Sequence, residues 1–191
     1  KGIRVRNQSI FLEREGMQLT LDGIAKGYIV DSAVAMLRRS GFSDVLVEAG
    51  GDLAASGQRS DGGPWRVGVR HPRAIEGAST QSMTTVEVSQ RAVATSGDYM
   101  NSFTQDFSRH HIVDPRSGLS PQELSSVTVL APTTMDADAL STTVMVLGLR
   151  EGMTLLERLP HVAGLLVSKA NENSDVKMWP TSNFPALGKV M

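Results

Sequence analysis

Residues 19–31 read Leu-Thr-Leu-Asp-Gly-Ile-Ala-Lys-Gly-Tyr-Ile-Val-Asp, and this stretch decides how the N-terminal half of the chain is organised. The apolar approach to it, through Met17, Leu19 and Leu21, favours an extended strand. Beyond residue 23 the apolar positions recur at helical spacing, and Gly41 stands where a C-terminal cap belongs. The sequence therefore predicts a strand, a tight turn at residues 22–23 and a helix over about 23–40.

The start of this predicted helix is a candidate anion site. A helix N-terminus offers unpaired backbone N–H groups and the positive end of the helix dipole, which together suit a phosphate. Lys26 adds a full positive charge in the first turn, where the dipole alone would disfavour one. The spacing is not that of a P-loop or a dinucleotide-binding fingerprint. Taken alone, the stretch favours an ordinary strand-to-helix connection with a surface lysine.

Composition narrows the class of protein. The 191 residues are 40% hydrophobic and 20% charged, as in an ordinary globular protein, and the length favours one domain over two small ones. A formal net charge of −1 and an aromatic content of 5% argue against a nucleic-acid partner. The absence of cysteine excludes disulfides, thiolate metal sites and a cysteine nucleophile. No apolar run approaches the roughly 18 residues of a transmembrane segment, and no signal peptide is visible.

Hydrophobic periodicity predicts many strands and few helices. Beyond the first helix, we expect helices at about 135–148 and 151–158, a loop at 71–83 and a polar tail from residue 171. The predicted strands are 2–6, 9–14, 44–48, 53–56, 65–70, 84–88, 108–113, 127–130, 162–167 and an edge strand at 175–179. Without a regular alternation of strands and helices, this pattern favours an α+β fold over a doubly wound sheet.

Four turns share one design, in which a glycine-rich strand end carries a carboxylate or a hydroxyl. Glycine accepts positive φ and lets another group approach the backbone closely, so four such turns suggest strand ends that converge on something polar. The alternative is a β-rich fold with ordinary turns. The four turns are Asp22-Gly23, Gly50-Gly51-Asp52, Thr95-Ser96-Gly97-Asp98 and Asp114-Pro115-Arg116-Ser117-Gly118.

Residues 135–142 carry a sharper signal. If a helix begins near Asp136, then Asp138 and Thr142 lie four residues apart on one face. A carboxylate and a hydroxyl together suit Mg²⁺, which takes few protein ligands and completes its shell with water and phosphate oxygens. Acidic residues also stabilise a first helical turn with no metal present, and that alternative remains open.

Two of the four histidines lie beside these turns. His110 and His111 precede the turn at residues 114–118, and a histidine there could act as a general base near neutral pH. Because adjacent strand residues face opposite ways, only one of the two can face a given site. A histidine that merely forms a hydrogen bond at a strand end is the alternative. We interpret His71 and His161 as structural or exposed.

Together these stretches resemble the FAD:protein FMN transferase family, the ApbE-type flavin transferases. Residues 65–72 and the Phe184-Pro185 pair also fit, so the resemblance covers roughly residue 17 to the end. Five segments carry it in the family's order: Leu21-Asp22-Gly23-Ile24-Ala25-Lys26-Gly27-Tyr28, Glu48-Ala49-Gly50-Gly51-Asp52, Ala94-Thr95-Ser96-Gly97-Asp98-Tyr99, His111-Ile112-Val113-Asp114-Pro115-Arg116-Ser117-Gly118 and Ala137-Asp138-Ala139-Leu140-Ser141-Thr142.

The resemblance implies a single ApbE-like α+β domain over residues 1–191, with mixed or antiparallel sheets and packed helices. It also implies Mg²⁺-dependent transfer of FMN from FAD to a threonine hydroxyl of an acceptor flavoprotein, with release of AMP. His111 matches the proposed base for that hydroxyl. The implied Mg²⁺ ligands are Asp138, Thr142 and the backbone carbonyl of Gly23. The implied FAD contacts are Thr20, Asp22, Lys26, Ser96, Gly97, Asp98 and Val113.

The chain departs from the family pattern at two points. Many members have an aspartate where this chain has Thr20, and a second glycine where it has Asp22. Only some twenty residues precede the first motif, so we expect the N-terminal part of the family fold to be missing. By resemblance alone, the protein acts in the periplasm or elsewhere outside the cytoplasm, within a family of membrane-associated lipoproteins, on a flavoprotein of a respiratory or redox complex. FAD hydrolysis to FMN and AMP, and a non-catalytic flavin- or partner-binding role, remain alternatives.

Overall fold

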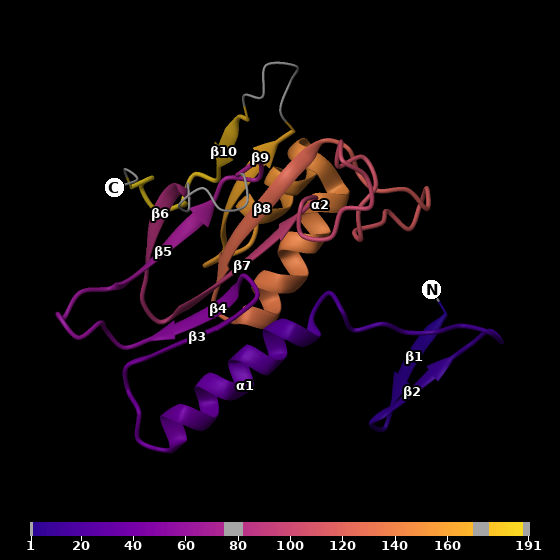
Figure 1. Cartoon of the computed structure of the whole chain (residues 1–191). Helices are drawn as coiled ribbons and strands as arrows, with labels where there is room; N and C mark the ends of the chain where they lie inside the picture. The colour runs from indigo at the N-terminus through magenta and orange to yellow at the C-terminus, as the bar shows by residue number, and fades with distance from the viewer. Residues whose placement is uncertain (1, 75–81, 170–175, 189–191) are drawn as a thin grey trace.

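A computed structural model describes residues 2–74, 82–169 and 176–188, and its centre is a six-stranded antiparallel sheet in the order β10-β9-β8-β7-β4-β3. Two further hairpins, β1-β2 and β5-β6, form separate two-stranded sheets (Figure 1). The helices are α1 (Ala25–Arg39) and α2 (Thr134–Glu157). The strands are β1 (Ile3–Arg6), β2 (Ser9–Leu12), β3 (Val45–Ala49), β4 (Asp52–Ser56), β5 (Trp65–Arg70), β6 (Ser82–Val88), β7 (Arg91–Gly97), β8 (Leu124–Ala131), β9 (Ala163–Ser168) and β10 (Met178–Pro180).

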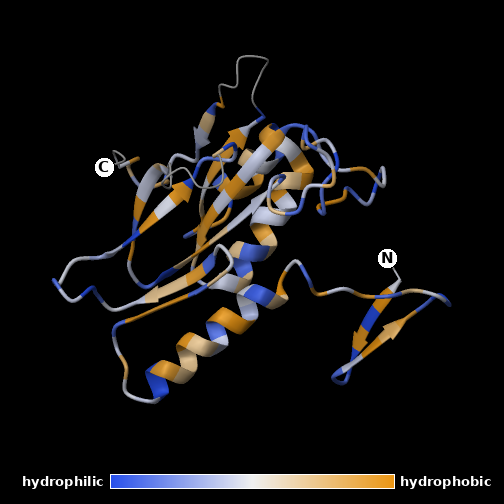
Figure 2. Cartoon of the chain, in the orientation of Figure 1, coloured by the Kyte–Doolittle hydropathy of each residue, from blue (hydrophilic) through white to orange (hydrophobic). Residues whose placement is uncertain are grey.

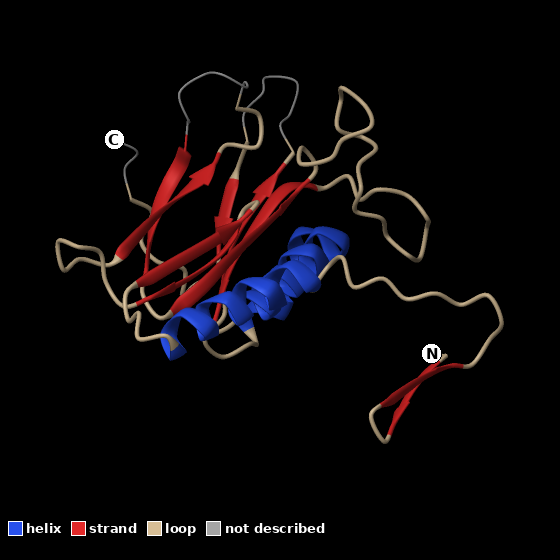
Figure 3. Ribbon diagram, turned by 60° about the horizontal axis from the view of Figure 1, so that its bottom comes forward, coloured by secondary structure: helices blue, strands red, loops and turns tan. Residues whose placement is uncertain are grey.

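The two helices cover one face of the six-stranded sheet, as Figure 3 shows. On β8, Val127 and Val129 belong to the apolar core shared with α2. Leu130, on the opposite face of the same strand, packs in a second core with Val86 and Val88 of the β5-β6 hairpin. Because β8 is covered on both sides, all eight of its residues are buried, and Figure 2 shows hydrophobic residues concentrated along the central strands. The predicted α+β fold with antiparallel sheets and packed helices is confirmed.

Most elements lie where the sequence predicts them. The first helix ends as expected, because Gly41 adopts a φ of +94° and the N–H of Phe42 donates to the carbonyl of Leu37. The two predicted C-terminal helices meet within α2 at Gly148, whose φ of +78° interrupts the helical backbone. A carboxylate oxygen of Glu123 accepts the N–H of Leu149 just after this kink, at 3.1 Å.

Two predicted strands are wrong. Residues 17–21 take no regular structure, and the side chains of Leu19 and Leu21 are exposed, because this approach to α1 pairs with none of the described strands. Residues 108–113 contain a single isolated bridge, between Ser102 and His110, instead of a strand. Residues 75–81 of the predicted loop and 171–175 and 189–191 of the predicted tail, with the first residue of the predicted edge strand, lie outside the described residues.

The β1-β2 hairpin stands away from the rest of the chain (Figure 1). Its register pairs Ile3 with Leu12 and Val5 with Ile10, which places four apolar side chains on one face. All four are exposed. The two residues at its tip, Asn7 and Gln8, both have positive φ, as a tight two-residue hairpin turn requires.

The first turns of α1 and α2 meet closely. A Cβ atom at Gly27 of α1 would lie 2.5 Å from the carbonyl oxygen of Thr134, so only glycine fits at this contact. Asp31, one turn further along α1, accepts the N–H groups of Thr134 and Met135 at 2.8 and 3.0 Å. It thereby satisfies two donors that the start of α2 would otherwise leave unpaired.

Replacing Gly27 by alanine tests this contact. Because the clashing atoms belong to the backbone of α2, the helices must separate, and we expect a loss of about 2 kcal/mol or more in the free energy of unfolding. Urea denaturation measures the change. Gly23→Ala is the matched control, since a Cβ at Gly23 would meet nothing within 4 Å. Equal stability of the two variants would contradict the prediction.

Candidate functional site

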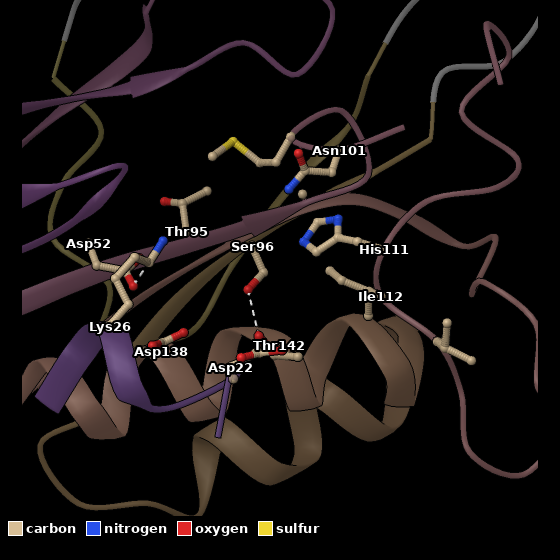
Figure 4. A pocket seen from close by; sticks show the side chains of 14 residues that line it. Asp22, Lys26, Asp52, Thr95, Ser96, Asn101, His111, Ile112, Asp138 and Thr142 are labelled. Carbon is tan, nitrogen blue, oxygen red and sulfur yellow. Dashed lines mark hydrogen bonds and ion pairs between the residues drawn. The ribbon is translucent and has the colours of Figure 1, made fainter. Parts of the chain in front are cut away.

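A cavity of about 260 Å³ opens where α1, β4, β7, α2 and the β7–β8 connection converge (Figure 4). Nine of the eleven predicted site residues line it: Asp22, Gly23, Lys26, Ser96, Gly97, His111, Val113, Asp138 and Thr142. Five further lining residues were not predicted: Asp52, Thr95, Met100, Asn101 and Ile112. Residues of three of the four glycine-rich turns therefore meet at one cavity, whereas none of residues 114–118, the fourth turn, lines it.

Asp138 and Thr142 lie one turn apart on α2, as the spacing predicts, and both line the cavity. The helix begins at Thr134, because the Thr133 side chain accepts the N–H of Asp136 as its cap. Asp138 is 6% exposed, and its Oδ2 accepts the N–H of Gly27 at 3.0 Å. Part of this carboxylate is therefore used to join the two helices.

A chain of hydroxyl groups links α2 to β7. The Thr142 Oγ1 and Ser96 Oγ atoms lie 2.9 Å apart, and Ser96 Oγ also lies 2.8 Å from Ser141 Oγ. Ser141 in turn donates to the backbone carbonyl of Asp138. These bonds fix the Thr142 hydroxyl at the cavity wall, beside the carboxylate of Asp138 (Figure 4).

Lys26 and Asp52 form an ion pair on the other side of the cavity. The Lys26 Nζ lies 3.2 Å from Asp52 Oδ2 and donates to the carbonyl of Gly50 at 3.2 Å. Asp52 is only 1% exposed. Burial and the negative charge of Asp138 raise the pKa of Asp52 to about 6, and Lys26 opposes that shift. The site thus holds two buried carboxylates, Asp52 and Asp138, whose negative charges repel each other. The partly exposed Lys26 pairs with Asp52.

The structure separates the two adjacent histidines. His111 lines the cavity, whereas His110 is 1% exposed and its Nε2 contacts the carbonyl of Pro121 at 3.2 Å. Burial lowers the pKa of His110, which favours its neutral form. The prediction that only one of the pair faces the site is therefore confirmed, although the strand from which it was derived does not form.

Two predicted FAD contacts lie outside the cavity. Thr20 is exposed, and its Oγ1 accepts the N–H of Asp22 at 3.2 Å within the turn before α1. Asp98 is fully buried, and both of its oxygens accept from the Arg73 guanidinium, at 2.7 and 2.9 Å. Lys169 Nζ lies 3.7 Å from the same carboxylate. Asp98 thus anchors the segments behind the cavity, and its predicted FAD contact has no support in this position.

Asp52 and Asn101 line the cavity, although neither was among the predicted site residues. Asp52 stands in one of the four glycine-rich turns, so a carboxylate at the start of a fully buried strand was a usable signal. Asn101 enters the cavity because its carbonyl accepts the N–H of His111, at 3.1 Å. The two residues lie ten positions apart in the sequence, and no local sequence pattern predicts that they pair.

Comparison with known proteins assigns the family. The sequence model of the ApbE family matches residues 1–166. The chain belongs to the ApbE family. It is 36% identical over 176 residues to a FAD:protein FMN transferase of Vibrio cholerae and 32% identical over 173 residues to one of Escherichia coli K12. These matches cover 91% and 90% of this chain but only 51% and 48% of the relatives, so the chain spans about half of their length.

Solved structures give the same family. A flavin transferase ApbE from Vibrio cholerae superimposes with a TM-score of 0.83 at 30% identity, over 97% of this chain and 58% of that one. The ApbE protein of Thermotoga maritima gives a TM-score of 0.81 at 29% identity, over 99% of this chain and 60% of that one. The ApbE-type fold predicted from the five motifs is therefore confirmed for this chain.

The raised pKa of Asp52 gives a pH test. Because the pKa of Asp52 is higher in the folded chain than in the unfolded chain, protonation of Asp52 favours folding. This contribution to the unfolding free energy is complete below the ordinary carboxyl pKa and is lost as the pH rises through about 6. Asp52→Asn keeps the shape and stays neutral. We therefore expect the difference in unfolding free energy, Asp52→Asn minus the unmodified protein, to increase by on the order of 2 kcal/mol between about pH 4 and pH 7.5. Urea denaturation at both pH values measures this, and a pH-independent difference would refute it.

Proposed function

We propose that this chain transfers FMN from FAD to a threonine hydroxyl of an acceptor flavoprotein, releasing AMP, in a Mg²⁺-dependent reaction. The observation that carries the proposal is the convergence of Asp138, Thr142, Lys26 and His111 on one cavity. Its relatives are FAD:protein FMN transferases, and the four residues occupy the positions that the family resemblance assigns to metal, FAD and base. An acceptor in a respiratory or redox complex, and a location outside the cytoplasm, belong to the same proposal.

The donor set at the cavity fits Mg²⁺. The Asp138 carboxylate, the Thr142 hydroxyl and the Gly23 carbonyl are hard oxygen donors, and water and substrate oxygens would complete the shell. A bound cation would also relieve the repulsion between Asp138 and Asp52. When bound, Mg²⁺ supplies positive charge beside the pyrophosphate of FAD.

The chain's own residues suit the remaining steps. His111 accepts the proton of the acceptor threonine hydroxyl, whose oxygen forms a bond to the phosphorus of the FMN half. The bond between that phosphorus and the bridging pyrophosphate oxygen breaks, and AMP leaves with the bridging oxygen. Lys26, held by Asp52 and the Gly50 carbonyl, places its ammonium group beside the pyrophosphate charge. Such transfer depends mainly on positioning and on neutralising charge.

The space around the site suits a molecule of the size of FAD. A second cavity of about 380 Å³ shares Thr95 and Met100 with the first. Its wall includes apolar side chains of β4, β5 and β7, namely Leu53, Val67 and Val93. An apolar chamber beside a polar one suits a ligand with flat rings joined through a charged pyrophosphate.

Asp138→Asn tests the metal-binding role. The amide oxygen can still accept the N–H of Gly27, so the fold is kept while the negative charge is lost. We expect turnover of FAD in Mg²⁺ to fall by on the order of 100-fold. We also expect the Mg²⁺-dependent rise in melting temperature to disappear. Fluorescence of the acceptor band on a denaturing gel, AMP release and a thermal melt measure these effects.

Asp136→Asn is the matched control for that experiment. Asp136 lies on the same helical turn but is exposed and hydrogen-bonded to Thr133, so its variant should behave like the unmodified protein. Biological activity that survives Asp138→Asn would instead support a non-catalytic, flavin- or partner-binding role. FMN and AMP in solution without a labelled acceptor would support FAD hydrolysis.

His111→Gln tests the base. Loss of a general base should lower the rate of transfer to the acceptor by about 10²- to 10⁴-fold, because the hydroxyl then lacks a proton acceptor. FAD affinity in the presence of Mg²⁺ should stay within about two-fold of the original, since the substitution removes no positive charge fixed to the pyrophosphate. Single-turnover labelling and fluorescence titration separate the two effects. Transfer at the original rate would eliminate His111 as the base.

A further inference from the structure

Within the β7–β8 connection, two short segments pair with each other beside the cavity and extend past its rim. Residues 101–103 run antiparallel to residues 109–111, with the N–H of His111 donating to Asn101 and the N–H of Phe103 donating to Arg109, at 3.1 and 2.7 Å. Ser102 and His110 form the bridge between these two pairs. Because side chains alternate along such a pairing, Asn101, His111, Phe103 and Arg109 share one side.

Burial agrees with this alternation. Asn101 and His111 line the cavity and lie next to each other in Figure 4, whereas His110 is buried on the opposite side. Phe103 and Arg109 do not line the cavity; they are the next pair outward. Phe103 is 74% exposed, and Arg109 is exposed with no ion-pair partner in the described parts of the chain.

Hydrogen bonds hold the tip of this segment in place. Asp106 Oδ1 accepts both the N–H and the hydroxyl of Ser108, and Thr104 Oγ1 accepts the N–H of Arg109. Lys169 then ties the segment to the body of the protein by donating to the carbonyl of Phe107, at 2.9 Å. The exposed aromatic ring and guanidinium are thus presented by an ordered turn, which lowers the entropic cost of binding to them.

We propose that Phe103 and Arg109 form the docking surface for the acceptor protein, and this rests on the proposed transferase function. A threonine that reaches His111 must enter past the rim of the cavity, and the chain on either side of it then lies across the neighbouring surface. Exposed aromatic and arginine side chains are the residue types that carry most binding energy at protein interfaces. Phe103 takes an apolar side chain of the acceptor, and Arg109 pairs with one of its carboxylates.

The two substrates, FAD and the acceptor protein, would contact different residues. FAD binds within the cavities, which neither Phe103 nor Arg109 lines. These residues should therefore affect the protein substrate and leave the nucleotide unchanged. Phe42 provides a matched control, because it is an exposed phenylalanine, at 59%, that follows the end of α1 remote from Lys26.

The test compares Phe103→Ala, Arg109→Ala and Phe42→Ala with the unmodified chain. The acceptor probe is the protein that the Vibrio cholerae transferase labels, and that enzyme serves as the positive control. Two quantities are measured: Mg²⁺-dependent affinity for FAD, and the rate of acceptor labelling as a function of acceptor concentration. We expect Phe103→Ala to raise the KM for the acceptor by at least about ten-fold, with kcat and FAD affinity unchanged. Arg109→Ala should raise the same KM and weaken its dependence on salt.

The outcomes are distinct. Acceptor labelling by Phe103→Ala and Arg109→Ala with unchanged KM would overturn the docking surface and leave the transferase function standing. An equal rise in KM for Phe42→Ala would overturn it as well. No labelling by the unmodified chain, while the Vibrio cholerae enzyme labels the same probe, would overturn the transferase function and the docking surface together.

Discussion

Two carboxylates, one from each helix, hold the start of the other helix, and the geometry of the site depends on this exchange. Asp31 of α1 accepts N–H groups at the start of α2, including that of Thr134, while Asp138 of α2 accepts the N–H of Gly27. Each carboxylate meets unpaired donors and the positive end of a helix dipole. At Gly27 the backbones of the two helices are in direct contact. This close approach places Lys26 of α1 and Asp138 of α2 at the same cavity.

This exchange changes the role expected of the first helix. The sequence made its start a candidate phosphate site, although the stretch alone favoured an ordinary connection; in the structure, Gly27 donates to Asp138 and Ala25 donates to the carbonyl of Leu21. The anion at the helix start is therefore a carboxylate of the chain itself. In the proposed reaction, the pyrophosphate of FAD would be held by the ammonium group of Lys26 and by a cation at Asp138, and the helix would act by fixing these groups in place.

Local patterns predicted the helices, most strands and the shared face of Asp138 and Thr142, because these follow from spacing along one element. They could not separate Asp52 from Asp98, since each follows a glycine at the end of a strand. The difference lies in their partners. Arg73 and a nearby lysine neutralise Asp98 from distant segments, whereas Asp52 has one partly exposed lysine and a second carboxylate nearby. These partners are distant in the sequence, so local patterns could not predict which of the two aspartates lines the cavity.

In the β7–β8 connection, the predicted strand does not form, yet His111 lines the cavity and His110 does not. From Arg109 to Val113 exposed and buried side chains alternate, as they would in a strand, which places His110 and His111 on opposite sides, although the buried Ile112 lines the cavity as well. The ladder stops after one bridge because the chain turns back through residues 104–108. The cavity is walled by β4, β7 and α2 on its inner side, and His111 lines it from the β7–β8 connection.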